Sequence, residues 1–163
     1  MSGKQFHFRG LWTELNRKMR GNIMPDLSQK ATELFNQGYS CSESIVRAAF
    51  ELGFIDNKID IASLTRITSA FSGGMGDSGC LCGAVAGAQI VIGHIFGRDD
   101  ISTPSNGIKS IAKQFVEKFI EKRKATCCRV LNAAKSRANC AGIVAESAEI
   151  LENLVKENLA VKS

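Results

Sequence analysis

The sequence predicts an all-α fold, and three observations support that class. Ala, Ile, Leu, Glu and Lys are abundant, which favours helix. Proline occurs only twice in 163 residues, and β-branched runs bounded by turn signals are scarce. The chain is long enough to bury one core. We therefore expect a single domain of five to six packed helices over residues 25–163, preceded by a basic N-terminal arm, residues 1–24.

The first two helices are predicted from their ends. Asp26 is a suitable N-cap for a helix over about 26–37, and Gly38 can end it in a left-handed conformation. Ser40, followed three residues later by Glu43, forms a capping box for the second helix.

The middle of the chain predicts a third helix over 60–71, a glycine-rich loop over 72–79 and a fourth helix over about 81–96. Small residues recur four apart on the fourth helix, which lets another backbone approach closely: Gly83, Ala84, Gly87 and Ala88. We expect this Gly/Ala-rich helix to be central. The same small face would also serve a homodimer contact.

Two further helices complete the predicted domain. A fifth opens at Ser105 or Ser110 and carries apolar residues at helical spacing, and the last begins near residues 137–140. A short connection between them holds Cys127 and Cys128.

The glycine-rich loop spells a dinucleotide-binding pattern, Gly74-x-Gly76-x-x-Gly79. That pattern needs a strand before the glycines, whereas residues 60–71 look helical. A phosphate-binding P-loop would have Lys after its last glycine, and here Cys80 follows. We therefore predict no bound nucleotide. The alternatives are a plain tight connection and a cysteine-based site to which the loop offers backbone N–H groups.

The six cysteines are the strongest chemical signal. Cys41, Cys80, Cys82 and Cys140 are predicted at helix starts, where unpaired N–H groups and the helix dipole favour thiolates. Basic neighbours would act likewise on Cys127-Cys128. No C-x-x-C pair exists, so zinc-ribbon and thioredoxin signatures are absent, as is the C-x-x-C-H of c-type haem. The alternative is buried cysteine acting as a small hydrophobe.

Four segments together resemble the C_GCAxxG_C_C family of redox-active proteins. The matching stretches run from about residue 31 to residue 154: "ATELFNQGYSCSESIVRAAFELG", "FSGGMGDSGCLCGAVAGAQIVIGHIFG", "CRVL" and "CAGIVAESAEILENL". The second contains the CGAxxG block, Cys82 to Gly87.

The resemblance implies an all-helical protein with a redox centre, such as an iron–sulfur cluster, and an oxidoreductase or transporter partner. Its metal ligands would be Cys41, Cys82, Cys128 and Cys140. Cofactor-binding glycines would be Gly74, Gly76, Gly79 and Gly83. The chain departs from the family pattern through its extra Cys80 and Cys127, the short gap before the last family cysteine, and the basic arm.

These observations lead to a small electron-transfer or redox-sensing protein whose four cysteines hold a cluster or cycle between thiol and disulfide. The alternative is a structural or interaction protein with a zinc site or no metal. Whether the protein is an enzyme stays open, although no Ser or Cys has an evident His and acid partner. His94 lies roughly 18 Å along a helix from Cys82, so it cannot share a single-ion site with it. His7 falls in the arm.

A shared centre also makes a geometric prediction. At least three of the four sulfurs should lie within roughly 8 Å of one another. The glycine loop should form one wall, Arg129 should lie nearby, and Cys80 or Cys127 should point elsewhere.

The net charge of +5 is unevenly distributed. Residues 109–137 carry nine Lys and Arg against Glu117 and Glu121. The two aromatic residues of this stretch, Phe115 and Phe119, belong to the apolar face of the fifth predicted helix. They are therefore not available to stack bases, and we predict a solvated surface and no nucleic-acid partner. We find no apolar signal segment and no membrane span, and we expect a cytoplasmic location.

Overall fold

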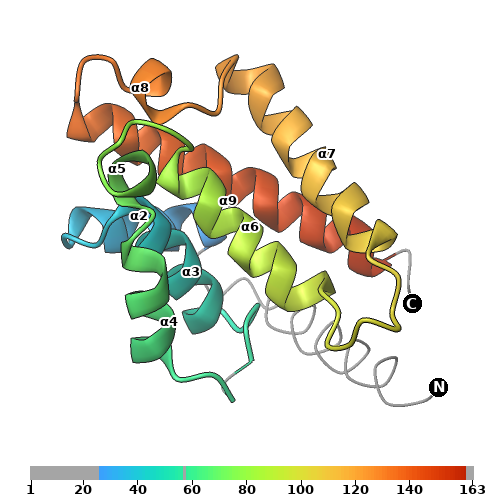
Figure 1. The fold of residues 1–163 in the computed structure, drawn as a ribbon. Coiled ribbons are helices and arrows are strands. Elements are labelled where there is room, and N and C mark those ends of the chain that lie inside the picture. The colour runs from blue at the N-terminus through green and yellow to red at the C-terminus, as the bar shows by residue number, and fades with distance from the viewer. Residues whose placement is uncertain (1–25, 57, 161–163) are drawn as a thin grey trace.

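The computed structural model describes residues 26–56 and 58–160, and this part of the chain is built from helices, without a strand (Figure 1). The all-α prediction is therefore confirmed. The predicted arm over residues 1–24, with His7, lies outside the described residues.

Six helices of nine residues or more form the body of the fold. They are α2 (Leu27–Asn36), α3 (Cys41–Glu51), α4 (Ile61–Ser69), α6 (Gly83–Phe96), α7 (Asn106–Arg123) and α9 (Arg137–Ala160). Two four-residue helices are also present, α5 (Ser72–Met75) and α8 (Cys128–Leu131). The described part of the chain therefore has more helices than the five to six that the sequence predicted. The sequence pattern missed α5 because Gly73 and Gly74 inside it have left-handed backbone.

The predicted helix starts at Asp26 and Ser40 are confirmed by hydrogen bonds. The Asp26 carboxylate accepts from the backbone N–H of Gln29 at 2.7 Å. The Ser40 hydroxyl accepts from the Glu43 N–H, and the Glu43 carboxylate accepts from the Ser40 N–H at 2.8 Å. The capping box therefore fixes the first turn of α3, where Cys41 lies.

Helix α6 is the central helix, as predicted. Most of its residues are buried, and it packs against α3, α7 and α9 (Figure 1). Gly87 shows why small residues are needed: a β-carbon there would lie 2.8 Å from the Ser42 carbonyl oxygen. Gly87 therefore allows α3 and α6 to approach each other closely, because it has no side chain.

Helix α9 runs along α2 and α7 and ties them together. The Glu152 carboxylate, almost fully buried, accepts from the Leu27 N–H at 2.9 Å and pairs with Lys156 at 2.8 Å. Three cations of α7 pair with glutamates of α9: Lys118 with Glu157, Lys122 with Glu149 and Arg123 with Glu146. Much of the basic stretch is therefore neutralised within the fold.

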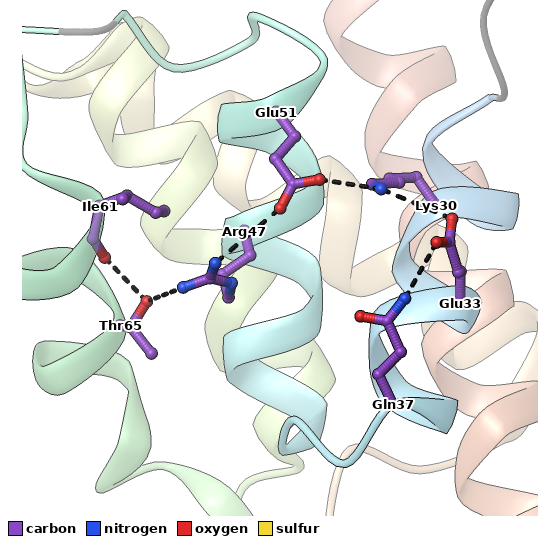
Figure 2. A network of polar contacts seen from close by, with 7 residues as sticks. All are labelled: Lys30, Glu33, Gln37, Arg47, Glu51, Ile61 and Thr65. Carbon is purple, nitrogen blue, oxygen red and sulfur yellow. Dashed lines mark hydrogen bonds and ion pairs between the residues drawn. The ribbon is translucent and has the colours of Figure 1, made fainter.

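A second polar network joins α2, α3 and α4 (Figure 2). Glu51 pairs with Lys30 at 2.9 Å and with Arg47 at 4.0 Å. The Arg47 guanidinium donates to the Thr65 hydroxyl at 3.0 Å and stacks on the Tyr39 ring. These contacts link α3 to α2 through Lys30 and to α4 through Thr65. Among the described residues, no helix is long and apolar enough to cross a membrane.

Candidate four-cysteine site

Four helix starts meet at one end of the fold, and each brings a cysteine. Cys41 is the first residue of α3, Cys82 is the N-cap of α6, Cys128 opens α8, and Cys140 lies in the first turn of α9. All four line one cavity of about 710 Å³. The structure therefore brings together the four cysteines that the family pattern singled out.

An isolated antiparallel bridge positions two of the four cysteines. Leu81 pairs with Cys127. The Cys82 N–H donates to the Thr126 carbonyl at 2.8 Å, and the Cys128 N–H donates to the Cys80 carbonyl at 2.5 Å. The loop before α6 is thus joined to the segment before α8, which places Cys82 and Cys128 beside each other.

Glycines let the cysteines approach other backbone. A β-carbon on Gly83 would collide with the Cys41 sulfur and lie 2.8 Å from the Phe71 carbonyl oxygen. A β-carbon on Gly74 would lie 2.5 Å from that of Cys128. Both glycines therefore serve close packing around cysteines.

The other two predicted glycines occupy turn positions. Gly76 and Gly79 both have left-handed backbone, with φ of 64° and 73°. Gly79 lines the cavity, as does Gly73 before it, whereas Gly76 ends α5. The glycine loop thus forms part of the cavity wall. A cofactor-binding role for any of the four glycines stays a prediction.

Asn132 holds its amide toward Cys140. The Asn132 Oδ1 accepts from the Ser136 N–H at 3.0 Å and from the Asn139 amide at 3.2 Å. Because a backbone N–H can only donate, the oxygen end of the amide must face Ser136. The NH₂ end therefore donates to the Cys140 sulfur, at 3.0 Å.

The electrostatics of the thiols differ from the sequence prediction. Burial, the largest cause, raises the pKa of Cys41, Cys128 and Cys140, and it raises the pKa of Cys82 to about 12. N–H groups at the helix starts lower the pKa of Cys41 and Cys82, but desolvation outweighs them. The expectation of thiolate-favouring positions is therefore wrong for these four cysteines, because burial raises the pKa of each thiol.

The same electrostatics show that the cavity cysteines act on one another. Cys128 and Cys140 each raise the pKa of Cys41, and Cys41 and Cys128 raise that of Cys82. Like-charge repulsion of this kind requires short separations. Ionising one thiol thus makes it harder to ionise the next, unless a cation compensates.

Charged side chains line the outer part of the cavity. Arg129 and Lys135 contribute positive charge and Asp77 negative charge. Arg129 was predicted to lie near the site, and its guanidinium donates to the Ser78 carbonyl at 2.8 Å. Sequence reasoning missed Asn132, Asp77 and Lys135, since no motif marks them.

The extra cysteines lie outside the cavity lining. Cys80 is exposed, and the Cys127 thiol donates to the Gly79 carbonyl at 3.1 Å. His94 also lies away from the site, near the other end of α6, where its Nε2 accepts from the Asp56 N–H at 3.4 Å.

The cavity cysteines do not form a single-ion site as they stand. Within residues 26–56 and 58–160, no three His, Cys, Asp or Glu side chains are grouped closely enough to hold one metal ion. A centre with several metal ions has ligands that stand further apart, and thiols alone are the usual ligands of iron–sulfur clusters.

Comparison with known proteins gives one match. A family model described as "Putative redox-active protein (C_GCAxxG_C_C)" matches residues 39–154. No curated protein and no solved structure matches the chain.

Proposed function

The chain belongs to the C_GCAxxG_C_C family of redox-active proteins, and from that premise we propose that Cys41, Cys82, Cys128 and Cys140 form its redox centre. The observation that carries the proposal is their convergence on one cavity from four separate helix starts. Core packing alone gives no reason for four cysteines of distant segments to share a cavity.

The residues present fit an iron–sulfur cluster. The donor set is four thiols, and the cavity is far larger than one ion. The raised pKa values do not oppose such a cluster, because a bound metal displaces thiol protons. When bound, a cluster would supply one-electron transfer. Without it, the same cysteines would cycle between thiols and a disulfide.

The chain's own residues would tune either form. Asn132 donates to the Cys140 sulfur and would stabilise negative charge there. Arg129 and Lys135 would stabilise negative charge at the cavity. Each of these effects favours the reduced, more negative state and so raises the reduction potential.

The proposal extends to the setting in which the protein works. We place it in the cytoplasm, where thiols stay reduced, with an oxidoreductase or other redox protein as its partner. The shared cavity opens beside exposed residues such as Arg129, so a partner could reach its edge without unfolding the domain.

The test is purification of the full chain under anaerobic conditions, followed by iron and acid-labile sulfide assay and a visible spectrum. We expect iron and sulfide in similar amounts and a brown protein. A chain with zinc alone would favour the structural alternative. A chain with no metal and no thiol that responds to oxidants would refute the redox proposal.

A further inference from the structure

The structure assigns a second redox-active pair, Cys80 and Cys128, which we propose reacts with low-molecular-weight disulfides of the glutathione class. Cys80 belongs neither to the cavity lining nor to the four family cysteines. It nevertheless lies across the short bridge from one of them.

The register of the bridge pairs these two residues. Leu81 is opposite Cys127, and the two flanking hydrogen bonds run from Cys82 to Thr126 and from Cys128 to Cys80. In an antiparallel arrangement this pattern places Cys80 opposite Cys128. Directly opposite residues have Cα atoms about 5.5 Å apart, within the range that a disulfide spans.

Side-chain alternation puts the pair on one face. Successive side chains of an extended segment point to opposite sides, so Cys80 shares a side with Cys82. Opposite residues also share a side, so Cys128 belongs there too. The cavity agrees with this alternation for three residues, because Cys82 and Cys128 both line it and Cys127 does not, while Cys80 lies at the exposed end of the bridge, outside the cavity lining.

The contacts of Gly74 show how close the two cysteines are. The position that its β-carbon would occupy lies 2.5 Å from the Cys128 β-carbon and 2.8 Å from the Cys80 backbone nitrogen. The Cys128 side chain and the Cys80 backbone therefore lie close to the same point, and a glycine there avoids a collision with both.

Exposure sets the order of the chemistry. Cys80 is exposed, whereas Cys128 is half-buried. The Cys80 thiolate attacks the small disulfide, forming a mixed disulfide and releasing one small thiol. The Cys128 thiolate then attacks the Cys80 sulfur, forming the Cys80–Cys128 disulfide and releasing the second. The protein loses two protons and two electrons, and the small disulfide gains them.

The exchange does not depend on the metal centre. Its consequence does rest on the proposed function, because a disulfide at Cys128 removes one of the four cavity thiols. Oxidation would then prevent assembly of the centre. The low-molecular-weight disulfide would in this way control whether the centre can form.

Oxidised glutathione is the probe for the test. The full chain, reduced and desalted, is incubated with it, the remaining thiols are alkylated, and the chain is digested with trypsin. Cleavage gives residues 67–98, with Cys80 and Cys82, and residues 125–129, with Cys127 and Cys128. We expect these two peptides to be linked, and fragmentation to place the bond between Cys80 and Cys128.

Three variants make the result decisive. Cys80→Ser should abolish the linked peptide, whereas the matched Cys127→Ser should retain it. Wild type should release about two glutathione thiols per chain and Cys128→Ser about one. A link that survives in Cys80→Ser, a link to Cys127, or a lasting glutathione adduct on Cys80 beside a free Cys128 would overturn the inference. Iron assay of the same preparation reports on the proposed centre separately.

Discussion

Replacing Gly83 by alanine tests how the fold holds Cys41 against α6. The new β-carbon would collide with the Cys41 sulfur and lie 2.8 Å from the Phe71 carbonyl oxygen. The Phe71 oxygen belongs to the backbone, so relieving that contact requires the chain to shift, and the Cys41 sulfur must move as well. Overpacking of this kind costs about 1–3 kcal/mol of folding free energy.

An opposing gain must be subtracted from that cost. Alanine within a helix is more stable than glycine by about 0.5–1 kcal/mol. We therefore expect Gly83→Ala to lower the free energy of unfolding by about 0–2.5 kcal/mol. Gly93, on the same helix, is the matched control because a β-carbon there meets nothing within 4 Å. Gly93→Ala should be stabilising by about 0.5–1 kcal/mol.

Urea unfolding followed by circular dichroism measures both variants. The slope of each transition should be unchanged, so that the midpoint reports stability alone. Gly83→Ala should also reduce the iron that the chain retains, because the Cys41 sulfur is displaced. A Gly83→Ala variant as stable as Gly93→Ala would refute the close packing from which this prediction is made.

Three further predictions concern single side chains. Asn132→Leu removes the amide that donates to the Cys140 sulfur at 3.0 Å. A spectroelectrochemical titration of the cluster-loaded protein should then give a lower midpoint potential. An unchanged potential would show that this hydrogen bond does not tune the centre. Burial raises the pKa of the Cys82 thiol to about 12, above its value of 9.0 in the unfolded chain. The protonated thiol therefore contributes fully to the free energy of unfolding below pH 9.0, and this contribution is lost as the pH rises toward 12. Alkylation of Cys82 in the metal-free protein should accordingly be slow at pH 8 and rise about tenfold per pH unit, and rapid labelling at pH 8 would contradict the burial. Glu152→Ala leaves the buried Leu27 N–H without its acceptor and should cost about 1–3 kcal/mol in urea unfolding, whereas the exposed Glu149→Ala should cost less than about 1 kcal/mol; equal losses would argue against the buried bond.

Most of the fold could be predicted from local signals in the sequence. Asp26 and the Ser40–Glu43 pair mark helix starts through contacts within one turn, so they can be read without knowledge of the tertiary structure. Helix α5 could not be read in this way, because Gly73 and Gly74 within it are left-handed and only long-range packing holds them there. The short α8 likewise depends on hydrogen bonds to Cys80 and Gly79.

The candidate site was predictable in position but not in electrostatics. The cysteine pattern placed residues at helix starts, and the helix dipole suggested ionised thiols. What the pattern could not show is how deeply each sulfur is buried, and desolvation of Cys82 exceeds the effect of the N–H groups of α6. The contact of Asn132 with Cys140 could not be predicted, because hydrogen bonds from Ser136 and Asn139 in the folded chain set the orientation of the Asn132 amide.

The most direct test of the redox centre is iron and sulfide content across a series of six cysteine-to-serine variants, each expressed and purified without oxygen. If the centre is the four-cysteine cavity, serine at Cys41, Cys82, Cys128 or Cys140 should remove most of the iron, the sulfide and the visible absorption. Serine at Cys80 or Cys127 should leave all three at the wild-type level. Iron that is absent from wild type, or that depends on Cys80 and Cys127 while the four cavity cysteines can be replaced without loss, would contradict the account.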